Sequence, residues 1–181
     1  FGRHFVEYDP ALKKFTFIQL VPSLAAMALE EDDEGRIWAA TYPDCALYSF
    51  DPATQKFADH GTLNKENWEQ YPRTIVAAPD GWLYIGLGNT QGQIVAFHRK
   101  TNEVRLLLSN EERPKPSSFF IRNFTDGKLY GRYNDIFYRL ADGTKTKCDV
   151  PTANLVLPAN SGDQGKIVPD FPSGRKLLSI D

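Results

Sequence analysis

Apolar and polar residues alternate along most of the chain in short runs, and turns rich in Gly, Asp, Asn and Pro separate these runs. The runs are rich in Ile, Val, Tyr, Phe and Trp, which favour strands, and a period of two is typical of strands with one buried face. No helical periodicity continues long enough to predict a helix. The pattern therefore predicts an all-β protein.

Glycine after an acidic or small residue marks a turn that recurs at an almost constant spacing. The four copies, Gly35, Gly81, Gly127 and Gly174, lie 46, 46 and 47 residues apart. Such a turn between apolar runs is a strong hairpin signal, because Gly adopts a positive φ without steric cost. A four-stranded propeller blade takes about 40–50 residues, so the spacing predicts a β-propeller. An ordinary β-sandwich would explain the hairpins but not their period.

A second turn alternates with the first, at the end of a strand that runs into polar residues. In two copies Pro presets φ, and the Asp before it can accept hydrogen bonds from the backbone that follows. The four copies are Asp9-Pro10, Asp51-Pro52, His98-Arg99 and Ala141-Asp142. The two kinds of turn divide each repeat into four strands, which we name a to d from the central axis outward.

This division predicts three complete four-stranded blades and two terminal half-blades. The half-blades are 1–22 and 162–181, and the complete blades are 23–60, 71–108 and 117–148. Their innermost strands are predicted at about 24–30, 73–78 and 118–124. The two half-blades could pair and close a four-bladed ring, which would remove exposed sheet edges. Alternatively, the chain could be part of a larger propeller. The absence of an initiator Met favours this second interpretation.

The d–a and b–c loops share one face of the propeller, because successive strands alternate in direction. These loops are longer and more varied than the tight turns on the opposite face, and function tends to lie on long loops held by a rigid scaffold. Aromatic, amide and arginine side chains suit a polar, ring-shaped ligand such as a sugar. The candidate ligand-binding residues on this face are Tyr42, Asp44, His60, Trp68, Tyr71, Arg73, Asn89, Gln91, Arg132, Tyr133 and Asn134. Trp68 and Tyr71 could instead pack a long loop onto the blade beneath.

Charge and cysteine content narrow the choice of partner. A net charge of −2 offers no basic field for nucleic acid or an anionic membrane surface. No apolar run approaches the roughly 18 residues that span a bilayer. Cys45 and Cys148 lack the spacing of metal ligands. We therefore expect neither nucleic acid nor a membrane as partner, and we predict no cofactor and no metal.

Histidines and a run of acidic residues are the remaining candidates for chemistry. No two of His4, His60 and His98 are spaced as a metal pair, and no Ser/His/Asp arrangement can be identified. We predict a hydrated surface histidine at each position, although His60 lies on the candidate face and could act as an acid or base. The run 30–34 lacks the spacing of a calcium loop, so we predict a solvated turn there.

The first complete blade resembles two groups of known propellers. Its residues Met27 to Thr41 and Leu47 to Pro52 resemble the repeats of two-component-regulator propellers and are equally similar to those of streptogramin lyase-like propellers, as are Pro79 to Gly86 in the next blade. The regulator resemblance implies a bacterial, periplasmic or secreted sensory module that binds glycan fragments. The lyase resemblance implies a His/Glu acid–base pair with magnesium on the funnel face, and no motif of this chain matches that pair. The long loop 60–72 departs from both groups.

We therefore predict a non-catalytic module that binds a small molecule or glycan on the face of the d–a and b–c loops. One alternative is a lyase or hydrolase that uses His60 with Asp44 or Arg73. Another is a structural domain whose partners are the remaining blades of a longer chain. An acid–base pair that meets across the funnel would favour the enzyme, whereas a lining of aromatic and amide groups would favour the binding module.

Overall fold

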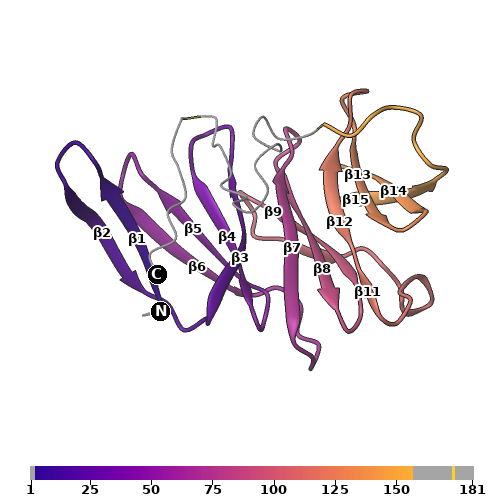
Figure 1. Ribbon diagram of the computed structural model, residues 1–181, viewed down its shortest axis with the longest axis horizontal. Coiled ribbons are helices and arrows are strands. Elements are labelled where there is room, and N and C mark those ends of the chain that lie inside the picture. The colour runs from indigo at the N-terminus through magenta and orange to yellow at the C-terminus, as the bar shows by residue number, and fades with distance from the viewer. Residues whose placement is uncertain (1–2, 157–172, 174–181) are drawn as a thin grey trace.

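A computed structural model describes residues 3–156 and residue 173. In this part of the chain the regular elements are fifteen strands and one short 3-10 turn, Asn110–Glu112. The strands form four antiparallel sheets that lie side by side in chain order (Figure 1). None of the described elements is a helix long and apolar enough to span a membrane. The prediction of an all-β protein is confirmed.

The strands follow the order predicted from the two kinds of turn. The N-terminal hairpin consists of β1 (His4–Asp9) and β2 (Lys14–Leu20). The first sheet consists of β3 (Ala25–Glu31), β4 (Ile37–Tyr42), β5 (Ala46–Asp51) and β6 (Lys56–Thr62). The second sheet consists of β7 (Gln70–Ala77), β8 (Trp82–Asn89), β9 (Gln93–His98) and β10 (Val104–Leu106), joined by β11 (Ser117–Ser118). The third sheet consists of β12 (Phe120–Asn123), β13 (Leu129–Tyr133), β14 (Ile136–Ala141) and β15 (Thr144–Cys148).

Two innermost strands differ from their predicted bounds. β7 begins at Gln70 rather than at residue 73, and its pairing with β8 continues across an irregularity at Arg73. The strand predicted at 118–124 is divided, because Ser117 and Ser118 pair with β8 of the second sheet before the chain enters the third. The predicted half-blade 162–181 lies outside the described residues except for residue 173. The two alternatives, a closed four-bladed ring and a part of a larger propeller, therefore remain predictions.

The two larger hydrophobic clusters lie between neighbouring sheets. Trp38 of the first sheet packs against Phe97 of the second, with ring centroids 5.8 Å apart. Tyr84 of the second sheet shares a buried cluster with Phe119 and Tyr138. A fully buried side chain of this kind contributes about 1.5–3 kcal/mol to stability. The stacking of each sheet on the next therefore carries most of the apolar burial.

The recurring turns at Gly35, Gly81 and Gly127 are each closed by an aspartate that also binds an aromatic side chain of the strand that follows. Asp80 accepts hydrogen bonds from the Trp82 backbone (3.0 Å) and the Tyr84 hydroxyl (3.3 Å). Asp126 accepts the equivalent bond from the Tyr130 hydroxyl (2.9 Å), and Asp32 accepts one from the Trp38 indole (2.8 Å). The glycines of these turns have φ of +79°, +90° and +75°, as the hairpin signal requires.

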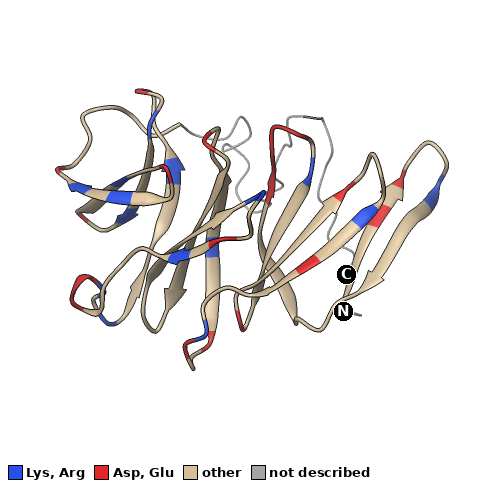
Figure 2. Cartoon of the chain, turned by 180° about the vertical axis from the view of Figure 1, so that it is seen from behind, with Lys and Arg blue, Asp and Glu red and all other residues tan. Residues whose placement is uncertain are grey.

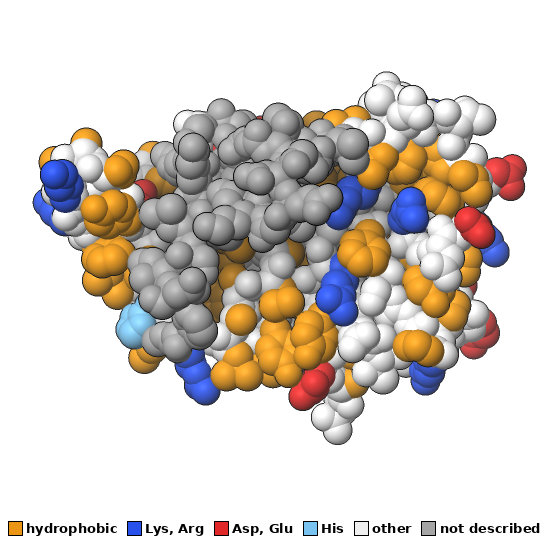
Figure 3. Space-filling view, viewed as in Figure 1, with side chains coloured by type: hydrophobic (Ala, Val, Ile, Leu, Met, Phe, Trp, Pro, Cys, Tyr) orange, Lys and Arg blue, Asp and Glu red, His pale blue; other side chains and the backbone are white. Residues whose placement is uncertain are grey.

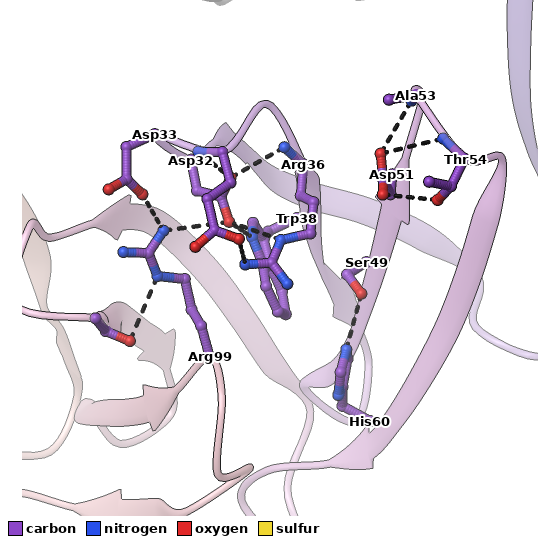
Figure 4. A network of polar contacts seen from close by, with 12 residues as sticks. Asp32, Asp33, Arg36, Trp38, Ser49, Asp51, Ala53, Thr54, His60 and Arg99 are labelled. Carbon is purple, nitrogen blue, oxygen red and sulfur yellow. Dashed lines mark hydrogen bonds and ion pairs between the residues drawn. The ribbon is translucent and has the colours of Figure 1, made fainter.

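The acidic run of the first sheet is only in part the solvated turn predicted from the sequence: Asp33 and Glu34 are exposed, whereas Asp32 is buried. Asp32 is only 4% exposed, because the guanidinium of Arg99 reaches it from the neighbouring sheet, at 3.2 Å, and also pairs with Asp33 (Figure 4). Burial opposes ionisation of Asp32, but hydrogen bonds from Trp38 and the charge of Arg36 outweigh it and lower the pKa of the carboxyl. The pattern of apolar and polar residues in one strand cannot predict an ion-pair partner that belongs to another sheet.

Candidate functional site

A cavity of about 320 Å³ opens on the face formed by the d–a and b–c loops, between the second and third sheets. We call it the funnel-face cavity. Its lining residues are Asn89, Pro116, Ser117, Ser118, Phe120, Arg132, Tyr133 and Asn134. Four of the eleven candidate residues thus come together here: Asn89, Arg132, Tyr133 and Asn134.

The wall of the cavity forms because the segment before β12 lies directly against β8. Ser118 pairs with Gly88, where any larger residue would place its Cβ 1.9 Å from the Ser118 hydroxyl oxygen. The Ser117 hydroxyl accepts a hydrogen bond from the Gly92 backbone (2.7 Å), which ties the same segment to the β8–β9 loop. The two glycines therefore allow the close approach that builds this wall.

The opposite wall is the tight turn between β13 and β14. Asn134 has φ of +50°, a left-handed conformation that Asn tolerates better than most residues. The Tyr133 hydroxyl donates a hydrogen bond to the Pro116 carbonyl (3.0 Å) and so joins the two walls. In the described part of the chain, the side chains of Asn89, Ser118 and Asn134 have no hydrogen-bond partner. These three polar groups are available to a bound molecule.

A partly buried ion pair joins two loops next to the cavity. Arg113, whose side chain is 3% exposed, binds Glu66 through both terminal nitrogens (2.8 and 2.5 Å) and donates from Nε to the Gly92 carbonyl (2.7 Å). The arginine holds the pKa of Glu66 at about 2. Sequence reasoning missed this pair, although its residues are 47 positions apart in consecutive d–a loops, a separation close to the repeat length.

Three further candidate residues form a separate aromatic stack at the junction of the first and second sheets. The rings of Tyr42 and Tyr71 lie 4.5 Å apart, and the guanidinium carbon of Arg73 lies 5.1 Å from the Tyr71 centroid. Close by in the chain, Asp44 forms a bridge with Gln70. The Arg73 Nε and one Asp44 carboxylate oxygen are buried without a hydrogen-bond partner among the described residues. Neither the stack nor Asp44 lines the funnel-face cavity.

The last three candidates, Trp68, Gln91 and His60, are packed within the fold and do not line the funnel-face cavity. Trp68 packs against the cluster between the first and second sheets and donates its indole N–H to Glu66 (2.9 Å), which is the packing alternative stated above. Gln91 is buried, with 8% of its surface exposed, and does not line the cavity.

His60 is not a hydrated surface histidine, which corrects the prediction for that residue. Its ring lies between Trp38 and Phe97, with centroids at 5.2 and 5.1 Å, and its Nε2 is 2.9 Å from the Ser49 hydroxyl (Figure 4). Burial lowers the pKa of the imidazole. Phe97 belongs to the second sheet, so the first sheet alone could not predict that it covers the histidine. Within the described residues no group of three His, Cys, Asp or Glu side chains could hold a metal ion.

Comparison with known proteins identifies the fold. No protein-family model and no curated protein matches the chain. Virginiamycin B lyase from Staphylococcus aureus is similar in structure, with a TM-score of 0.61 at 17% identity over 83% of this chain and 50% of the lyase. A streptogramin B lyase gives a TM-score of 0.59 at 17% identity, over 83% and 49% of the two chains. The extracellular domain of a proposed one-component system from B. thetaiotaomicron has a TM-score of 0.58 at 14% identity. The match covers 82% of this chain and 20% of that domain.

These likenesses agree with both resemblances of the sequence and show a propeller-like fold. The chain spans about half the length of the lyases that it matches. At such low identity the likeness describes the fold and not the activity.

Proposed function

We propose that the chain is a propeller module that binds a carbohydrate or a similar polar, ring-shaped molecule in the funnel-face cavity. The observation that carries the proposal is the cavity itself, where candidate residues from two b–c loops meet the segment 116–118. Its volume of about 320 Å³ falls within the usual range for small-molecule sites, about 300–1,000 Å³.

The chemistry of the lining suits such a ligand. Phe120 and Tyr133 supply flat apolar surface, on which the C–H face of a sugar ring can pack. The amides of Asn89 and Asn134 and the hydroxyl of Ser118 offer both donors and acceptors for ring hydroxyl groups. Because β8 and β13 are strands of rigid sheets, these groups need little ordering when a ligand binds.

We propose further that this module works as part of a larger propeller, whose other blades are its partners. The support is the share of the two lyases that the chain covers, about half of each. An extracytoplasmic location, implied by the regulator resemblance, fits the same proposal, since one of the similar structures is an extracellular domain.

A glycan array followed by titration calorimetry with each hit tests the proposed function. Substitution of both amides, Asn89→Ala with Asn134→Gly, should weaken binding at least tenfold, because two hydrogen-bonding groups are lost. Glycine at position 134 preserves the positive φ and so protects the turn. The matched control is Asn123→Ala on β12, an exposed amide that does not line the cavity. Unchanged binding to the double variant would place the site elsewhere.

The lyase alternative has one observation in its favour, the similar fold of the lyases. Quinupristin, the compound present with one of those structures, is the substrate to try. Conversion of quinupristin by the wild-type protein but not by a His60→Ala variant would replace the binding proposal with an enzymatic one.

A further inference from the structure

We propose that the ligand of the funnel-face cavity carries an anionic group, a carboxylate or a sulfate on a sugar, and that Arg132 binds this group. The inference rests on the proposed function and adds the charge of the ligand to it. Arg132 is the only charged residue among the eight that line the cavity, and no Asp or Glu side chain lies there to neutralise it.

The arginines in the described part of the chain divide into those with a carboxylate partner and those without one. Arg36, Arg99, Arg105 and Arg113 each form an ion pair with a carboxylate at 3.2 Å or less. Arg132 forms none with any described residue, and its guanidinium carbon instead lies 5.6 Å from the centroid of the Phe137 ring. Arg132 is also exposed, so its guanidinium is accessible to an anion from solution.

A second arginine without a carboxylate partner lies beside the first. Arg122 on β12 donates only to the Ile121 carbonyl among the described residues (3.0 Å). Burial and the charge of Arg132 lower the pKa of Arg122. Arg122 is half-buried and Arg132 is exposed, and two like charges this close repel each other unless a counter-charge joins them.

The sheet register places both guanidinium groups on one face of the third sheet. Phe120 pairs with Arg132 and Arg122 pairs with Tyr130, and paired residues of antiparallel strands share a face. The guanidinium carbon of Arg122 lies 5.9 Å from the Phe120 centroid. In the space-filling view, Lys and Arg side chains gather beside hydrophobic ones over this part of the molecule, with the acidic side chains toward its rim (Figure 3).

This arrangement is suited to an acidic sugar. A guanidinium binds a carboxylate or sulfate through two parallel N–H donors, which fixes the position of the group as well as its charge. Phe120 would then pack against the ring of the same sugar, and the free amides of Asn89 and Asn134 would contact its hydroxyl groups. Loss of one charge-assisted contact of this kind weakens binding about tenfold or more.

Matched pairs of oligosaccharides test the inference, each pair being a uronic acid or sulfated oligomer and the same oligomer with the carboxyl reduced or the sulfate removed. We expect the wild-type protein to bind the acidic member at least tenfold more tightly. Arg132→Gln should remove this preference, and Arg132→Lys, which keeps the charge without the fork, should retain part of it. Arg139→Gln, an exposed arginine on β14 outside the cavity, carries the same change of net charge and should retain all of it.

The possible results separate the two proposals. Equal binding of acidic and neutral members refutes the anionic ligand and leaves the proposed function intact. A preference that survives in Arg132→Gln also refutes it, because the charge would then be recognised elsewhere. Failure of every oligosaccharide to bind refutes the proposed function together with the inference.

Discussion

Tyr84 offers a sharp test of how neighbouring sheets are joined. Its side chain is fully buried, and its hydroxyl donates to Asp80 (3.3 Å) while it accepts the backbone N–H of Gly143 (2.8 Å) from the third sheet. Tyr130 stands one repeat later and donates to Asp126 (2.9 Å), but its hydroxyl accepts no backbone N–H from another sheet in the described part of the chain. The two tyrosines therefore differ in one contact between sheets.

Substitution by phenylalanine at each position isolates that contact. Both variants lose a hydrogen bond to a carboxylate that water can reach, so this part of the effect is similar. Tyr84→Phe also leaves the buried Gly143 N–H without an acceptor, which costs about 1–3 kcal/mol. We therefore expect the free energy of unfolding of Tyr84→Phe to be lower than that of Tyr130→Phe by about 2 kcal/mol, the middle of that range.

Urea unfolding at pH 7, followed by tryptophan fluorescence, measures the difference. Gly143 lies against Trp82, since a Cβ at Gly143 would come within 2.5 Å of its ring, so the fluorescence reports on this junction. Equal stability of the two variants, within about 0.5 kcal/mol, would refute the reasoning, because the bond from Gly143 would then contribute nothing net.

Two further predictions concern the junction of the first and second sheets. Arg99→Met should lower the free energy of unfolding by about 2–3 kcal/mol, because it leaves Asp32 buried with fewer partners. Asp33 is the exposed partner of the same arginine, so Asp33→Asn should lower the free energy of unfolding by less than about 1 kcal/mol. Urea titrations of both variants check this, and equal losses would contradict it. The pKa of His60 is lowered in the folded protein, so the unfolded chain takes up the proton first and stability should fall as pH drops below about 6.5. A His60→Gln variant should lose less stability than wild type between pH 8 and pH 5, and an identical loss would exclude the histidine as the cause.

The fold was largely predictable because its main signals are local and repeated. A Gly-containing turn needs only its own residues to form, and four copies at one spacing report the repeat length directly. The bounds of β7 and β12 were less predictable. β7 continues past the irregularity at Arg73 to Gln70, which pairs with Asn89 of the same sheet. Ser117 pairs with Asn89 from the next repeat, and a pairing across repeats leaves no local mark in the sequence.

The candidate site was predictable in kind but not in detail. Long loops on one face indicated where to look, and four of the candidate residues do line the cavity there. The segment with Ser117, Ser118 and Phe120 was missed, because its place depends on the close approach that Gly88 and Gly92 allow. The prediction of hydrated groups failed at Asp32 and His60 for a related reason, since Arg99 and Phe97 cover them from the next sheet.

One aspartate in the first sheet and one in the second perform two tasks, and only the first task can be predicted from the sequence. Asp80 closes its own turn and also accepts the Asp142 backbone N–H from the next sheet (2.7 Å), whereas Asp32 closes its turn and binds the side chain of Arg99. The acceptor is thus constant, but the donor is a backbone group at one junction and a guanidinium at the other. A repeat can conserve an acceptor in the sequence without conserving its donor, because any N–H that the neighbouring turn presents satisfies the carboxylate. The spacing of the repeats therefore predicts where sheets meet, while the stability of each junction depends on a donor that the structure alone identifies.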